Sequence, residues 1–225
     1  MKTTVKRSFK NQLYDHFARI GKALANGHRL EILELLAQGE RSVEALALET
    51  DLSIANASQH LQVLKACGLI EVRREGTFGF YQLADQSVFA LWQAMRTLGE
   101  THLAEVDRLV TNHLERQTLE SISLAELGLK LKQGKVTLLD VRPLEEFNAG
   151  HIRGAMAVPL AELELKLKKL PKRYEVVAYC RGPYCVFADD AVALLLEHGF
   201  KARRLELGLP DWRMAGYPVE QGLAA

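Results

Sequence analysis

A short loop between two apolar runs restricts how the second half of the chain can fold. The run 175–179 precedes this loop, Cys180 and Cys185 bracket it, and an amphipathic run, 186–198, follows. The succession predicts a buried strand, a tight turn and a helix. Because the turn is short and contains a glycine and a proline, its backbone N–H groups should point inward, and the helix N-terminus adds its own unpaired N–H groups.

This predicted loop favours a reactive thiol at Cys180. Backbone N–H groups and a positive helix end stabilise a thiolate, and they also hold an anion presented to the sulfur. Arg181 adds a positive charge beside the thiol. The alternative is that both cysteines are small buried packing residues, but the strand–loop–helix context favours chemistry.

Composition indicates a globular protein of two domains. The chain has 225 residues, of which 48% are hydrophobic and 25% charged. Its three cysteines form no secretory framework, the N-terminus has no apolar signal core, and no window is long and apolar enough to span a membrane. We therefore expect a cytoplasmic protein without a membrane partner. Before residue 30 the chain has seven Lys or Arg residues and one acidic residue, a basic segment that could bind phosphates.

The first half predicts a winged helix-turn-helix. Residues 1–12 are polar and expected to fray, and helical periods then begin at Tyr14 and Leu30. Ser42 heads a short helix, and Ser53 caps a second helix that runs to Cys67. Two strands, 69–74 and 78–83, follow as a hairpin.

The outer face of the second of these helices carries short polar side chains suited to base edges and phosphates, and the hairpin carries arginines for the backbone or minor groove. The expected DNA-binding residues are Ser53, Asn56, Ser58, Gln59, His60, Arg73 and Arg74. The alternative is a solvated polar face, but the combination at this spacing favours DNA.

Residues 14–100 resemble the ArsR family of small dimeric repressors. The matching text is ALANGHRLEILELLAQGERSVEALA, followed by LSIANASQHLQVLKACGLIEVRREGTFGFYQL, with a Ser-x-x-x-x-Ser-x-His-Leu pattern from Ser53 to Leu61. The resemblance implies a homodimer that binds double-stranded operator DNA. It also implies an interface made by the first helix and by the helix after the wing, expected over residues 85–117.

The metal sites of that family are not expected here. The segment 41–46, which in some relatives carries ligating cysteines, has none. A second family site maps onto Asp85, Ser87, Leu98 and Thr101, of which only the aspartate is a ligand type. His102 and His113 lie elsewhere on the same helix, and Cys67 is expected to pack. No metal and no cofactor are therefore predicted.

The second half alternates strands and helices, which predicts an α/β domain with a mostly parallel sheet. Ser123 and Glu126 form a capping box, and apolar strands are expected at 136–141, 156–158, 176–179 and 202–207. Ligand sites in such sheets lie at the carboxyl ends of strands. Asp140, Arg142 and Cys180 all fall there.

Residues 123–220 are similar to a single rhodanese domain, through LLDVRPLEEFNAGHIRGAMAVP, VVAYCRGPYC and LELGLPDWRMAGYPV. The resemblance implies sulfur transfer, in which Cys180 attacks a sulfane sulfur donor such as thiosulfate or polysulfide and becomes a persulfide. Arg181 should attract the donor. Asp140, Arg142 and Arg153 resemble supporting charges, or are structural ion pairs. The persulfide cradle is expected from Gly182, Pro183, Tyr184, Cys185 and Val186.

The loop from Cys180 to Cys185 is six residues long, the length that the family associates with sulfur transfer and not with phosphate or arsenate. Cys185 departs from relatives that carry Thr, Ser or Arg. A second thiol in the loop can resolve a persulfide into a disulfide or bridge sulfurs, or it can simply pack at the helix start.

These observations predict a winged helix-turn-helix domain (1–117), a linker (118–122), a rhodanese domain (123–220) and a tail (221–225). The predicted protein is a DNA-binding regulator, expected to repress, whose Cys180 persulfide senses or transfers sulfur. Two alternatives stay open. One is a sulfurtransferase that is merely tethered to DNA, and the other is a metalloid-responsive repressor using Cys67, Cys180 and Cys185.

Overall fold

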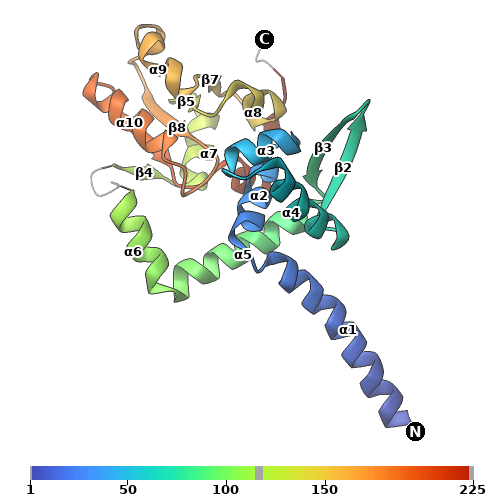
Figure 1. Ribbon diagram of the computed structural model, residues 1–225. Helices are drawn as coiled ribbons and strands as arrows, with labels where there is room; N and C mark the ends of the chain where they lie inside the picture. Colours follow the sequence, from blue (N-terminus) through green and yellow to red (C-terminus); the bar gives the residue numbers. More distant parts are fainter. Residues whose placement is uncertain (1, 115–118, 223–225) are drawn as a thin grey trace. The chain divides into compact units, whose positions relative to one another are not determined.

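The computed structural model describes residues 2–114 and 119–222 (Figure 1). The chain divides into two compact units, Met1–Gln93 and Ala94–Ala225. The division falls within helix α5 (Gln86–His102). The expected domain boundary at residues 117 and 118, and the end of the expected tail at 223–225, lie outside the described residues. The predicted domain ranges remain predictions.

The N-terminal unit is a winged helix-turn-helix, as predicted. Ser42 and Ser53 cap helices α3 and α4, because their hydroxyls accept the N–H groups of Ala45 and Asn56, both at 3.3 Å. Strands β2 and β3 form the antiparallel wing, and β1 pairs with β3. The elements are α1 (Lys2–Leu24), α2 (Gly27–Gln38), β1 (Arg41–Ser42), α3 (Val43–Glu49), α4 (Ile54–Ala66), β2 (Ile70–Glu75), β3 (Phe78–Leu83) and the start of α5.

Two helices differ from the expectation. Helix α1 begins at Lys2, although residues 1–12 were expected to fray; the segment contains no Gly or Pro that would break a helix. The single helix expected over 85–117 is instead α5 and α6 (Ala104–His113), which are separated by an extended Leu103 (φ −108°, ψ 100°). Glu105 and Asp107 favour a new helix N-terminus at this point.

The C-terminal unit is an α/β domain with a five-stranded sheet in the order β4-β9-β8-β5-β7, and every pair is parallel, as predicted. A short antiparallel pair, β6 and β10, lies apart from it. The elements are β4 (Ser121–Ile122), α7 (Leu124–Lys132), β5 (Val136–Asp140), α8 (Leu144–Ala149), β6 (His151–Ile152), β7 (Met156–Ala157), α9 (Leu160–Lys166), η2 (Leu167–Lys169), β8 (Glu175–Tyr179), α10 (Phe187–Glu197), β9 (Ala202–Leu205), α11 (Leu209–Met214) and β10 (Val219–Glu220).

Both faces of this sheet are covered, which explains why its strands are continuous apolar runs. Side chains alternate between two cores: Leu139 of β5 packs with α9 and α10, and Leu138 packs with α7, α8 and α11. Strands β5 and β8 pair in parallel, so their carboxyl ends, at Asp140 and Tyr179, lie side by side. Within the described ranges, no helix is long and apolar enough to cross a membrane.

Candidate functional site

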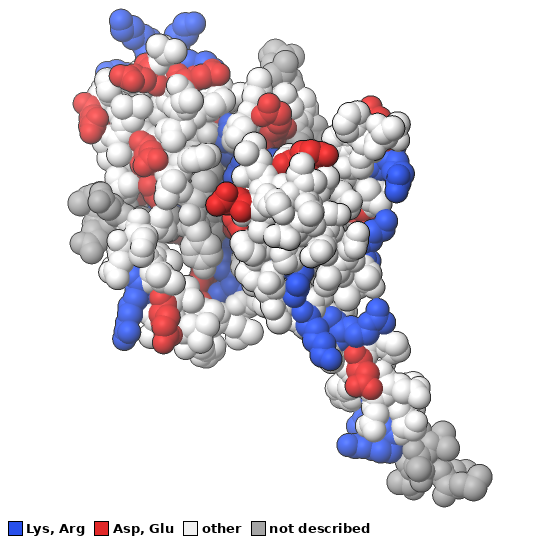
Figure 2. Space-filling view, in the orientation of Figure 1, with Lys and Arg blue, Asp and Glu red and all other residues white. Residues whose placement is uncertain are grey.

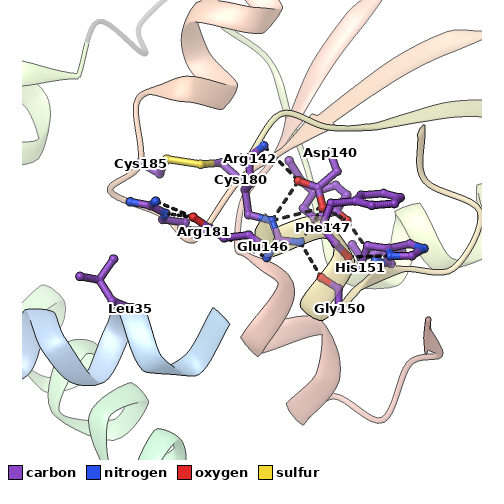
Figure 3. Close-up of polar contacts among 12 residues, drawn as sticks. Leu35, Asp140, Arg142, Glu146, Phe147, Gly150, His151, Cys180, Arg181 and Cys185 are labelled. Carbon is purple, nitrogen blue, oxygen red and sulfur yellow. Dashed lines mark hydrogen bonds and ion pairs between the residues drawn. A yellow bond between two sulfur atoms is a disulfide. The ribbon is translucent and has the colours of Figure 1, made fainter. Parts of the chain in front are cut away.

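Cys180 lies at the carboxyl end of β8, where the sequence places it. Its side chain is buried, with 2% of its surface exposed, and a disulfide joins it to Cys185 (Figure 3). The two Cα atoms are 6.3 Å apart. Helix α10 begins two residues after Cys185, at Phe187. The loop therefore brings both sulfur atoms to the N-terminal end of α10.

The loop is a tight turn, in which the N–H group of Cys185 donates to the carbonyl oxygen of Gly182 at 3.3 Å. That N–H is thus engaged within the turn, and Pro183 has none to offer. The opposite wall is Gly208, where an added Cβ would lie 2.0 Å from the carbonyl oxygen of Arg181. Only glycine permits this approach of two backbone segments. Sequence analysis did not single out Gly208, because the contact spans two distant loops.

Arg181 is held by a carboxylate. Its Nε and Nη2 donate to Oε1 of Glu146 at 2.9 and 2.5 Å. Glu146 is 3% exposed and lies 3.8 Å from Nη1 of Arg142. In this state the guanidinium secures the loop to α8 (Figure 3). Sequence analysis missed Glu146; its place six residues after the end of β5, near the carboxyl edge of the sheet, was the available signal.

Asp140 and Arg142 form a fully buried pair beneath the loop. Arg142 donates through Nε to Oδ1 at 2.9 Å and through Nη2 to Oδ2 at 2.5 Å. The Tyr179 hydroxyl donates to Oδ2 of Asp140 at 2.5 Å and accepts the N–H of Ile152 at 3.0 Å. Burial raises the pKa of Tyr179 well above its ordinary value, and the charge of Asp140 raises it further. Burial alone would lower the pKa of Arg142, but its hydrogen bonds with Asp140 raise it.

Three guanidinium groups of this unit differ in how they are balanced. Arg142 and Arg181 are balanced by Asp140 and Glu146, whereas Arg213 of α11 is a third guanidinium whose pKa is lowered by burial and then by the charge of Arg142. Arg153, the fourth charge predicted here, pairs with Glu220 at 2.9 Å on the surface.

The predicted DNA-contacting face of α4 is presented to solvent. Asn56 and Gln59 are exposed and Ser58 and His60 partly exposed, whereas Ala57 on the opposite face is buried. The His60 ring lies 5.8 Å from that of His28. Burial, followed by the charges of Arg29 and His28, lowers the pKa of His60. A neutral imidazole can accept as well as donate a hydrogen bond.

The two wing arginines differ. Arg73 is paired with Glu40, at 3.0 and 2.5 Å, and with Glu75 at 2.9 Å, so it is already neutralised. Arg74 is exposed. Further basic side chains lie on helix α1, the extension at the lower right of Figure 2. Phosphate contacts from the wing would therefore fall mainly to Arg74.

Among the described residues, no group of three or more His, Cys, Asp or Glu side chains is arranged to hold a metal ion. Cys67 is a free, partly exposed thiol at the end of α4, and its Sγ lies 3.7 Å from the carbonyl oxygen of Arg19.

Comparison with known proteins identifies both units. The family described as "Bacterial regulatory protein, arsR family" matches residues 26–72, and the family described as "Rhodanese-like domain" matches residues 123–215. The HTH-type transcriptional regulator Rv0324 of Mycobacterium tuberculosis is 47% identical over 213 residues, which are 95% of this chain and 94% of that protein. The chain belongs to the ArsR family of HTH-type transcriptional regulators. Unlike the small ArsR repressors, this regulator carries a C-terminal rhodanese domain.

Two solved structures each resemble one part of this ArsR-family regulator. The homodimeric winged helix-turn-helix DNA-binding domain Mb0332 of Mycobacterium bovis is 51% identical, with a TM-score of 0.40, and the match covers 42% of this chain and 87% of that one. A rhodanese-related protein of Thermoplasma volcanium is 31% identical, with a TM-score of 0.41, and the match covers 45% of this chain and 97% of that one.

Proposed function

We propose that this ArsR-family regulator responds to sulfane sulfur, which Cys180 takes up as a persulfide, and that the sulfur changes its affinity for operator DNA. The observation that carries the proposal is the Cys180–Cys185 disulfide at the N-terminal end of α10. In reducing compartments, disulfides are usually transient and belong to catalytic or redox-sensing sites. Here the pair lies in a rhodanese domain attached to a DNA-binding unit.

Sulfur uptake begins from the reduced loop. The Cys180 thiolate attacks the outer sulfur of thiosulfate; a new S–S bond forms, the S–S bond of thiosulfate breaks, and sulfite leaves with the electron pair. The positive N-terminus of α10 favours both the donor anion and the anionic persulfide.

Cys185 then resolves the persulfide. The Cys185 sulfur attacks Sγ of Cys180, and a new S–S bond forms between the two cysteines. The S–S bond of the Cys180 persulfide breaks, and hydrosulfide leaves with the electron pair and the proton. The product is the disulfide of this structure. A cellular dithiol restores the two thiols and is itself oxidised to a disulfide.

The DNA-binding unit is proposed to act as a homodimer on double-stranded operator DNA, most simply as a repressor located in the cytoplasm with its DNA. The exposed apolar side chains of α1 support a second copy as the partner, because they recur along one side of the helix. They are Phe9, Leu13, Tyr14 and Phe17, which are 65%, 37%, 61% and 56% exposed.

Reduced protein exposed to thiosulfate tests this chemistry. The wild type should release hydrosulfide and close the disulfide, Cys185→Ser should accumulate a persulfide that cyanide removes, and Cys180→Ser should do neither. Cys67→Ser is the matched control and should behave as wild type. Absence of sulfur uptake would remove the proposal. Arsenite binding that requires all three cysteines would favour the metalloid-responsive alternative.

A further inference from the structure

Helix α5 makes two contacts with the elements around the sulfur loop. Within the C-terminal unit, Nη2 of Arg96 lies 2.6 Å from Oδ1 of Asp211, and the two side chains are 5% and 1% exposed. One turn later, Glu100 accepts a hydrogen bond from the Tyr184 hydroxyl at 2.8 Å. Residues four apart lie on the same face of a helix. One face of α5 therefore contacts both α11 and the loop.

The Arg96 contact reaches the loop through Gly208. Oδ2 of Asp211 accepts the N–H of Gly208 at 3.2 Å, and Gly208 packs directly against the backbone of Arg181. A buried ion pair with its oxygens further hydrogen-bonded is difficult to separate. This contact should hold α5 on α11 whatever the state of the cysteines.

The Glu100 contact is of a different kind. Tyr184 precedes Cys185, so its position depends on whether Cys185 is tied to Cys180. Its hydrogen bond with Glu100 is exposed, and an exposed hydrogen bond is easily exchanged for water. Tyr184 is therefore the loop side chain that connects the chain at Cys185 to α5, through its hydrogen bond with Glu100.

Helix α5 continues into the N-terminal unit. Its residues up to Gln93 belong to that unit, and Val88 and Phe89 of its first turns are buried. A helix is stiff over this length, because its backbone hydrogen bonds run without a break from Gln86 to His102. A shift of its last turns is therefore transmitted to its first turns.

We infer that Glu100 and Arg96 are positioning residues that couple the sulfur state of the Cys180 loop to the DNA-binding unit through α5. Arg96 is the fixed anchor, and Glu100 is the contact that changes. The inference rests on the proposed function and names its regulatory connection. A coupling through one exposed contact should fall at the lower end of the usual range, about fivefold in operator affinity.

The test compares Glu100→Ala with Glu105→Ala, a matched exposed glutamate on α6. Each protein is loaded with thiosulfate, its sulfur release is measured, and the same sample is titrated onto an operator selected from random duplexes. We expect all three proteins to take up sulfur equally. The shift in operator affinity should be retained in the wild type and in Glu105→Ala, but lost in Glu100→Ala.

A double-mutant cycle adds a second readout. Because Tyr184 and Glu100 form one contact, Tyr184→Phe alone should lose the shift as Glu100→Ala does, and the two losses should not add when the substitutions are combined. A full shift in Glu100→Ala would overturn the coupling while leaving the proposed function intact. A wild type that loads sulfur without any shift would overturn both.

Discussion

The buried hydroxyl of Tyr179 provides a sensitive test of how the sulfur loop is supported. Tyr179→Phe keeps the ring and removes one oxygen, which donates to Asp140 and accepts the N–H of Ile152. A buried N–H left without a partner costs about 1–3 kcal/mol, and a lost hydrogen bond to a charged group costs about 1.5–3 kcal/mol. Asp140 keeps its hydrogen bonds from Arg142, so we use the lower end of the range for the lost hydrogen bond to a charged group. We expect a total of about 3 kcal/mol.

Urea unfolding measures this loss, with Trp212 fluorescence as the reporter in a Trp92→Phe background, since the chain has two tryptophans. Trp212 lies in the same buried cluster as Tyr179. The control is Tyr174→Phe, a partly exposed tyrosine of the same unit, expected to change stability by less than about 0.5 kcal/mol. If Tyr179→Phe costs less than about 1 kcal/mol, the assigned hydrogen bonds do not support the loop.

The same residue gives a pH signature. Because its pKa is raised in the folded protein, Tyr179 keeps its proton at a pH where the unfolded chain, with a pKa of about 10, releases it. Its contribution to stability is complete below that pH and is lost as the pH rises through the raised folded pKa. The stability of Tyr179→Phe should therefore fall less steeply in alkali than that of the wild type.

Three further predictions test other parts of the molecule. Gly208→Ala should abolish sulfur uptake and lower the free energy of unfolding by about 1–3 kcal/mol or more, because the new Cβ would meet the backbone of Arg181. Backbone strain is not the cause, since alanine tolerates the φ of −105° at residue 208. The hydrogen bond from Arg203 lowers the pKa of Glu175 in the folded protein. The Glu175 carboxylate therefore contributes its full stability above about pH 4.3, and this contribution is lost as the pH falls through the lowered folded pKa. Arg203→Gln should lose less stability in acid than the wild type. Gln59→Ala should weaken operator binding by about 1–3 kcal/mol, measured by fluorescence anisotropy, without changing sulfur uptake.

Each of these has an internal control. Gly99→Ala places a Cβ in ordinary contact, 3.9 Å from Val106, and should leave sulfur uptake unchanged; equal uptake by both glycine variants would contradict the close packing of the loop. Equal acid sensitivity of Arg203→Gln and wild type would show that the pair does not stabilise the unit. Binding of Gln59→Ala to non-operator duplexes should equal that of wild type, and a uniform loss would assign Gln59 to phosphate contact.

Local signals predicted most of the fold. The serines at positions 42 and 53 cap the helices that the sequence assigns to them, because a cap depends on residues three positions apart. Strands β5 and β8 are continuous apolar runs, so their burial and parallel pairing followed from the alternation of strands and helices. The sequence therefore also predicted that Cys180 lies at the carboxyl edge of the sheet.

The unpredicted features depend on long-range contacts. Glu146 and Arg181 are 35 residues apart, and Gly208 meets the loop only because α11 folds back onto it. The pairing of Arg73 with Glu40 likewise joins separate elements of the winged helix. Periodicity and motif spacing describe one element at a time, so they cannot show which charges neutralise one another.

Whether sulfur at Cys180 changes DNA binding can be measured on one sample. The operator affinity of the reduced full-length protein is measured before and after thiosulfate treatment of the same sample, with Cys180→Ser in parallel. We expect a shift of about fivefold or more in the wild type and none in Cys180→Ser. An affinity that stays constant while Cys180 takes up sulfur would contradict the claim and leave a sulfurtransferase joined to an independent DNA-binding unit.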